Sequence, residues 1–187
     1  YHLDQEINDR GIALDMVMVE NAILFDERSR SDLTASMQDI TDVDNPNSVA
    51  QMKQWLSDNG IETESLGKKD VAKLIEDTSG KVEDALRLRL QLAKSSVKKH
   101  QAMQNAVCKD GRAHGMFQFY GANRSGRWAG RLIQLQNLPQ NHMKGLAEVR
   151  EIVRSGDYET MELLYDDIPG ALSQLIRTAF VVRDGIS

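Results

Sequence analysis

Three arginines and the glycines between them form the segment whose residue types most clearly suit binding chemistry. Arg124, Arg127 and Arg131 are spaced by three and four residues, with Gly126 and Gly130 between them. Arginine presents a planar fork of donors that suits phosphate oxygens and acceptors on base edges. Glycine lets another molecule approach the backbone closely. Two interpretations are open at this point: a surface for phosphates or bases, or a loop whose arginines pair with acids elsewhere in the chain.

Side-chain amides follow the arginines directly. The segment from Leu132 to Pro139 places Gln134, Gln136 and Asn137 among apolar residues. An amide both donates and accepts hydrogen bonds, so it can recognise acceptors in a nucleic-acid groove without adding charge. The alternative is a polar loop in which Pro139 ends a strand.

The net charge of −5 and the pI near 5.4 at first argue against a nucleic-acid partner, which favours a basic surface. The charge is unevenly spread, however. Between Ala85 and Gln140 lie ten of the 23 Lys and Arg residues and one of the 28 acidic residues, so this block carries +9 and the rest of the chain −14. The ten cations are Arg87, Arg89, Lys94, Lys98, Lys99, Lys109, Arg112, Arg124, Arg127 and Arg131.

The composition excludes several other classes of protein. With 41% hydrophobic residues, 27% charged residues and no long apolar run, the chain is expected to be globular, without a membrane-spanning helix. The single cysteine, Cys108, cannot form an internal disulfide and fits a reducing compartment. Because the four histidines are scattered and no Cys or His has zinc-ligand spacing, no metal site is expected.

The elements that must position these residues are mostly helices, so the predicted fold is mainly α with a small β component (α+β). Helical periodicity dominates up to Val107, and an aromatic-rich strand is predicted from Ala113 to Tyr120. A second strand is predicted at 179–182. The predicted helices are 3–9, Asp15 to about Ile40, 49–59, 70–77, Lys81 to about Val107, 145–155, 157–165 and 170–177.

The helix predicted from Lys81 to Val107 is the longest and forms a long antiparallel pair with the helix that Asp15 begins. Its leucines share one side, and beside them runs a polar stripe. This stripe is either a basic rail or the solvated face of a docked helix. Its members are Arg87, Gln91, Lys94, Lys98 and Gln101.

The segment from Ser125 to Pro139 resembles a stretch of family A DNA polymerases, which are similar to bacterial repair polymerase I. In that stretch Thr-Gly-Arg is followed by Asn-Ile-Pro, matching Ser125-Gly-Arg127 and Asn137-Leu-Pro139 here. Other landmarks resemble the family in order: 4–15 the segment entering the thumb, 47–56 a thumb helix start, 91–103 the long thumb helix and 174–181 the segment before the first catalytic strand.

The resemblance implies a piece of a phage or prophage polymerase that comprises the thumb and the opening part of the palm. Residues 1–10 would end the helix entering the thumb, 11–107 would form the thumb, and 108–187 would form the N-terminal part of an incomplete palm. This palm part would carry a short β-ribbon and a helical insertion at about 141–172.

The resemblance also carries roles to single residues. Lys94 would lie near the DNA backbone, Arg127 in the minor groove at the primer terminus, and Gln136 and Asn137 along the minor groove. Gln134 stands where the family usually has Asn. Lys98, Arg124 and Arg131 have no family counterpart, and charge and spacing alone suggest that they contact phosphates.

The implied activity is DNA-directed DNA polymerisation during replication. The parent protein would add dNTPs to a primer by two-metal transfer with two Mg²⁺, holding a primer–template duplex as a monomer in the cytoplasm of a bacterial or infected cell. This chain alone would be inactive, because in the family the catalytic aspartates and the nucleotide-binding helix follow the position of Ser187.

The alternative function is a helical protein-interaction module whose basic stripe meets an acidic partner. A hydrolase ranks last, since no nucleophile, base and orienting group occur together.

Overall fold

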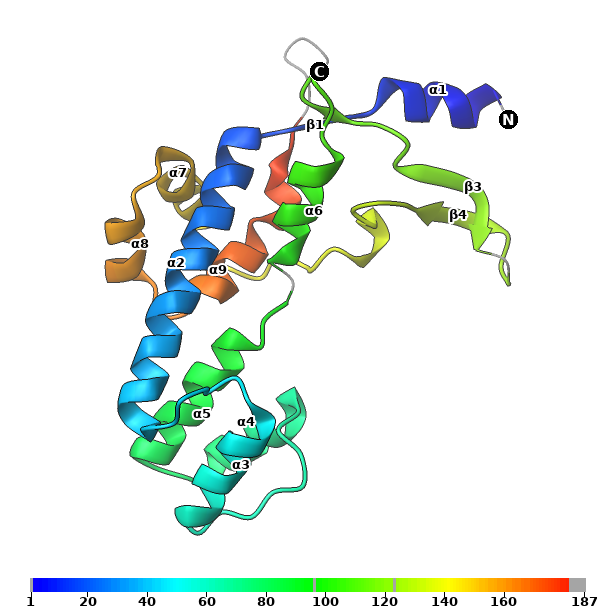
Figure 1. Ribbon diagram of the computed structural model, residues 1–187. Helices are drawn as coiled ribbons and strands as arrows, with labels where there is room; N and C mark the ends of the chain where they lie inside the picture. Colours follow the sequence, from blue (N-terminus) through cyan, green and yellow to red (C-terminus); the bar gives the residue numbers. More distant parts are fainter. Residues whose placement is uncertain (1, 96, 123, 182–187) are drawn as a thin grey trace. The chain divides into compact units, whose positions relative to one another are not determined.

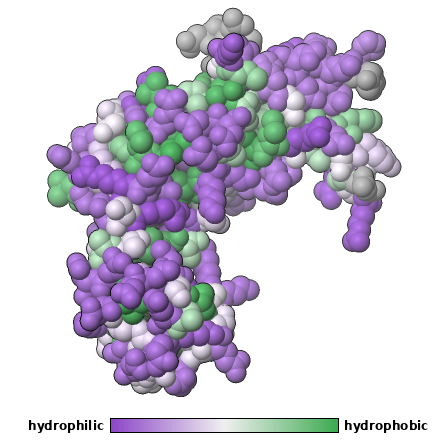
Figure 2. Space-filling view, in the orientation of Figure 1, coloured by the Kyte–Doolittle hydropathy of each residue, from purple (hydrophilic) through white to green (hydrophobic). Residues whose placement is uncertain are grey.

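The structure, a computed structural model, describes residues 2–95, 97–122 and 124–181 (Figure 1). Helices dominate, with small antiparallel sheets, which confirms the predicted mainly α fold. The chain forms two compact units, one from residues 1–26 and 96–187 and the other from 27–95. These units are defined by how the chain packs. The thumb (11–107) and palm (108–187) boundaries come from the family resemblance and stay a prediction. Hydrophilic residues cover much of the face in Figure 2, with hydrophobic patches between them.

The first unit combines helices with two small sheets. Strands β1, β2 and β5 pair antiparallel in the order β2-β1-β5, and β3 pairs with β4 in a separate hairpin. Its elements are α1 (His2–Arg10), β1 (Ile12–Leu14), the start of α2 (Met16–Thr41), α6 (Lys98–Ala106), β2 (Arg112–Ala113), β3 (Phe117–Ala122), β4 (Arg127–Gly130), η1 (Leu135–Asn137), α7 (Leu146–Ser155), α8 (Tyr158–Leu164), α9 (Ile168–Gln174), η2 (Ile176–Ala179) and β5 (Phe180–Val181).

Local signals set the ends of the first helices as the sequence predicted. Gly11 adopts φ +62° after α1, a conformation that glycine tolerates best. Asp15 caps α2, since its Oδ1 accepts a hydrogen bond from the Met18 N–H at 3.3 Å. The same carboxylate, with a side chain 8% exposed, forms ion pairs with Arg150 and with Arg154, the latter at 3.2 Å. Asp15 therefore ties the start of α2 to α7.

The second unit contains the rest of α2 with α3 (Val49–Asp58), α4 (Lys68–Glu76) and α5 (Lys81–Leu92). Leu56, Val71 and Leu86 form its buried core, against which Trp55 packs. Ser48 caps α3 by accepting the Gln51 N–H at 3.4 Å, as the turn and cap residues predicted.

The single helix predicted from Lys81 to Val107 is wrong. Helix α5 ends at Leu92, and α6 begins at Lys98. The Arg30 guanidinium donates hydrogen bonds to the carbonyls of Leu92 at 2.8 Å and Lys94 at 2.6 Å, so these carbonyls are satisfied without a continuing helix. Ser95 and Val97 have low helix propensity, which weakens the helix at the same place.

Smaller differences concern the later elements. The strand predicted from Ala113 to Tyr120 is divided between β2 and β3, with Gly115 at φ +64° between them. The helix predicted at 170–177 begins earlier, at Ile168, because the Asp167 carboxylate accepts the Gly170 N–H at 2.9 Å. The predicted strand at 179–182 is present as β5 up to Val181, and Val182 lies outside the described residues.

Candidate nucleic-acid interface

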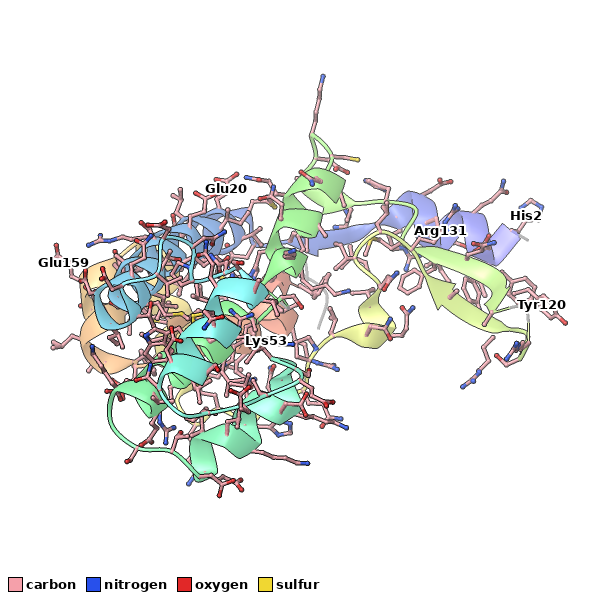
Figure 3. All side chains as sticks on the ribbon, turned by 60° about the horizontal axis from the view of Figure 1, so that its bottom comes forward. His2, Glu20, Lys53, Tyr120, Arg131 and Glu159 are labelled. Carbon is pink, nitrogen blue, oxygen red and sulfur yellow. The ribbon has the colours of Figure 1, made fainter. Side chains whose placement is uncertain are left out.

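The hairpin of β3 and β4 carries the three predicted arginines. Phe117 pairs with Gly130 and Gln118 with Ala129, and the turn closes with the Gly126 N–H donating to the Ala122 carbonyl at 2.9 Å. Figure 3 labels Tyr120 near the turn and Arg131 toward the other end of the hairpin. Arg124 lies in the turn, Arg127 begins β4, and Arg131 directly follows β4.

All three arginine side chains are exposed to solvent. Arg127 Nε donates to Ser125 Oγ at 3.0 Å, while the guanidinium groups of Arg124 and Arg131 have no hydrogen-bond or ion-pair partner among the described residues. The sequence contains no Asp or Glu from Gly111 to Ala147. The described part of the chain therefore shows none of the pairing with acids that the alternative interpretation of this loop required, and the positive charge stays available to a ligand.

The predicted amides lie on the segment that follows the hairpin. Gln134, Gln136 and Asn137 are all exposed, and Asn137 Nδ2 donates to Gln134 Oε1 at 3.2 Å. The idea that Pro139 ends a strand is wrong, because the segment forms the 3₁₀ turn η1 instead. Gln134 itself adopts a left-handed conformation at φ +55°, which is costly for a residue other than glycine. The side-chain amides of Gln134 and Asn137 are thus held next to each other at the surface.

The prediction that Gly126 and Gly130 admit another molecule is corrected by the structure. A Cβ atom at Gly130 would overlap the side-chain oxygen of Gln136, and one at Gly126 would lie 2.7 Å from the ring of Tyr120. The chain's own side chains therefore occupy the space that these glycines leave. Both glycines serve the internal packing of the hairpin.

Cationic side chains anchor the segment that carries the amides. Ile133 is fully buried, and Lys99 from α6 donates to its carbonyl at 2.6 Å. Arg177 from η2 donates to the carbonyls of Pro139 at 2.7 Å and Leu138 at 3.2 Å. Because both ends are tied to helices of the same unit, the amides between them are held in place. Nothing in the spacing of Lys99 and Arg177 along the chain points to these contacts, so the sequence predicted Lys99 only as part of the basic block and gave no site role to Arg177.

Asn8 of α1 positions the other side of the hairpin. Its Nδ2 donates to the Phe117 carbonyl at 2.8 Å, and its Oδ1 accepts the Phe117 N–H at 3.0 Å. This pair of bonds imitates a neighbouring strand along the edge of β3. The role of Asn8 could not be predicted from the sequence either, because its partner Phe117 lies 109 residues away.

The basic block divides into cations with structural roles and cations that face solvent. Arg89 donates to the Pro46 carbonyl at 2.9 Å, and Arg112 donates to the carbonyls of Arg10 and Gly11 at 2.7 and 2.8 Å. Arg89 and Arg112 therefore hold parts of the fold together through backbone carbonyls, as Lys99 does.

The polar stripe predicted from Arg87 to Gln101 does not form one helix face, because α5 and α6 are separate helices. Arg87 is also paired with Glu83, with its Nε at 2.8 Å from the carboxylate. Lys98 is exposed on α6 in the first unit, whereas Lys94 follows α5 in the second unit and is half-buried. The protein-interaction alternative, which rested on a continuous stripe, loses its supporting observation.

Two histidines have shifted pKa values. Burial lowers the pKa of His100 to about 4, and the nearby Val97 carbonyl opposes this shift without forming a hydrogen bond to the ring. The hydrogen bond to Asp110 at 2.9 Å raises the pKa of His114.

Within the described residues, no group of three or more His, Cys, Asp or Glu side chains is arranged to hold a metal ion. None of the described helices has the length and apolar character needed to cross a bilayer.

Comparison with known proteins gives a clear relationship. The chain is 50% identical over 184 residues to a protein named DNA polymerase from Bacillus phage SP02, which covers 98% of this chain and 28% of that protein. The chain thus spans little more than a quarter of the length of this curated relative. No protein-family model matches the chain, and no solved structure matches it. At this identity over nearly its whole length, the chain is homologous to part of a phage DNA polymerase.

Proposed function

We propose that the chain is the part of a DNA-directed DNA polymerase that grips the primer–template duplex during replication. The finer assignment, as argued from the sequence, is the thumb (11–107) and N-terminal palm (108–187) of a phage-type family A enzyme. The observation that carries the proposal is the exposed, acid-free segment in which three arginines and three amides lie on one anchored hairpin and turn. The homology to a phage DNA polymerase supports it.

The proposed mechanism of binding follows from the chemistry of these side chains. Acceptors in the minor groove are largely shared among the base pairs, so Arg127 and the amides of Gln134, Gln136 and Asn137 can contact any sequence there. Charged contacts to the phosphates position the duplex without reading it. Lys94, Lys98, Arg124 and Arg131 are the cations proposed for those contacts.

The whole enzyme would join a dNTP to the primer 3′ end with two Mg²⁺ ions. Such ions would polarise the reacting oxygens once bound to carboxylates. Among the described residues no three or more His, Cys, Asp or Glu side chains are arranged to hold such ions. In this proposal the chain presents the duplex in a fixed register and does not polymerise alone. The enzyme would act as a monomer in the cytoplasm of the host cell.

The proposal is tested by the fluorescence anisotropy of a labelled primer–template duplex titrated with the chain. About four phosphate contacts should weaken binding about a hundredfold between roughly 50 and 200 mM salt. Arg127→Ala together with Lys94→Ala should lower both the affinity and the salt dependence. Lys144→Ala is a matched control, since Lys144 is exposed and lies outside the proposed contacts. Binding that is unaffected by salt, or by the double variant, would refute the proposal.

A further inference from the structure

An exposed aromatic cluster on the β3–β4 hairpin is not used by the duplex contacts proposed above. Phe119, Tyr120 and Trp128 are 56%, 62% and 41% exposed. The Phe119 and Trp128 ring centroids lie 5.3 Å apart, nearly edge to face, and those of Phe119 and Tyr120 lie 6.4 Å apart. Burying such side chains is normally worth about 1.5–3 kcal/mol each, so leaving three of them at the surface calls for an explanation.

The backbone of the hairpin holds the cluster in a fixed arrangement. Between the pairs Gln118–Ala129 and Ala122–Arg127 the register shifts, which forms a bulge on β3. Within it Tyr120 adopts φ +55°, and its ring lies against Gly126. Strain of this kind persists only where the surroundings enforce it, so the aromatic surface is preformed.

The surroundings of the cluster indicate the chemistry of its ligand. Arg124 and Arg131 flank it along the chain, and their guanidinium groups have no partner among the described residues; no acid occurs from Gly111 to Ala147. The ligand should therefore be anionic and should offer flat apolar faces. Unpaired nucleotides combine both properties, whereas a duplex keeps its base faces stacked inside the helix and out of reach.

We propose that Phe119, Tyr120 and Trp128 form a stacking platform for unpaired nucleotides of a single DNA strand that continues from the gripped duplex. This inference rests on the proposed function for the position of that strand. Successive residues of a strand point to opposite faces, so Trp128 and Arg127 project from different sides of β4. The platform and the minor-groove contacts are thus separable by substitution.

The test compares three labelled DNAs: a blunt duplex, the same duplex with a single-stranded extension of about eight nucleotides, and the extension alone. The extension should strengthen binding of the duplex. Tyr120→Leu and Trp128→Leu should each weaken binding of the extended duplex about tenfold. Trp128→Phe should retain the stronger binding, and blunt-duplex binding should stay unchanged in all three variants. Since Tyr120 contributes little to the core, Tyr120→Leu covers the case in which a Trp128 variant fails to fold.

Tryptophan fluorescence gives a second measurement. In a Trp55→Phe background, Trp128 is the remaining one of the two tryptophans, and stacking on a base should quench its emission. Equal binding of blunt and extended duplexes without quenching would overturn the platform and leave the proposed function standing. Binding of the extension alone, with no duplex binding, would support the platform and refute the proposed function. If no DNA binds, both fail, and a protein partner becomes the better explanation of the aromatic surface.

Discussion

The buried histidine of α6 gives the sharpest prediction about stability. His100 is fully buried, and neither ring nitrogen has a hydrogen-bond partner among the described residues. Burial disfavours the charged form and lowers the pKa of this side chain from 6.5 to about 4. The unfolded chain therefore binds the proton at a higher pH than the folded chain does.

The direction and size of the pH effect follow from this difference. Where the unfolded state binds more protons, the free energy of unfolding rises with pH. The stability of the chain should thus fall as the pH drops below 6.5 and stop changing through His100 below about 4. At about 1.4 kcal/mol per pKa unit, the loss amounts to roughly 3 kcal/mol.

The assay is urea unfolding of the wild type and of His100→Met at several pH values between these limits. Methionine is apolar and flexible enough to fill the space. The variant should lose most of the pH dependence and be more stable by about 1–3 kcal/mol at neutral pH, because two unsatisfied polar atoms are removed. His114→Gln is the matched control: the raised pKa of His114 gives stability that is fully present below pH 6.5 and is lost only as the pH rises above it, so this variant should keep the fall in stability that the wild type shows between pH 6.5 and 4. If wild type and His100→Met show the same pH dependence, the reasoning is wrong.

Three further substitutions test the contacts that position the hairpin and α2. Asn8→Ala should cost about 2 kcal/mol and speed hydrogen exchange of the β3 amide that Asn8 holds, with Asn8→Asp as the variant that keeps the acceptor. Asp15→Ala should cost about 2–4 kcal/mol in thermal unfolding, because it removes a helix cap and the carboxylate that pairs with Arg150 and Arg154, whereas Asp15→Asn keeps the cap and should cost less. Gly130→Ala should only turn the far end of the exposed Gln136 side chain aside and should cost at most about 1 kcal/mol in thermal unfolding; a larger loss that adding Gln136→Ala does not relieve would refute the packing argument.

The parts of the fold that the sequence predicted well are those fixed by neighbouring residues. Gly11, Asp15 and Ser48 mark helix ends because capping chemistry acts within three or four residues. The break between α5 and α6 could not be predicted in this way. It depends on Arg30, which reaches a carbonyl 62 residues further along the chain, and helical periodicity carries no information about such a contact.

The candidate site shows the same difference between features fixed by neighbouring residues and features fixed by tertiary contacts. Arg124, Arg127 and Arg131 were predicted together and do lie on one hairpin, because they are close in sequence and a hairpin is a local structure. The left-handed backbone at Gln134 and the bonds from Asn8 were not predictable. Each is imposed by tertiary contacts that outweigh the local preference of the residue.

The roles of the basic residues follow from the availability of carbonyl groups, and charge alone does not assign them. Lys99 and Arg112 donate hydrogen bonds to backbone carbonyls that would otherwise be unsatisfied, so they stabilise the fold. Arg124 and Arg131 stand where the described chain offers them neither a carbonyl nor an acid. Replacing Lys99 or Arg112 should therefore lower the stability of the fold. Replacing Arg124 or Arg131 should leave the fold intact and reduce the slope of log affinity against log salt concentration by about 0.9 per lost phosphate contact. A net charge, or even the charge of a block, cannot separate these two effects, because both kinds of cation contribute equally to it.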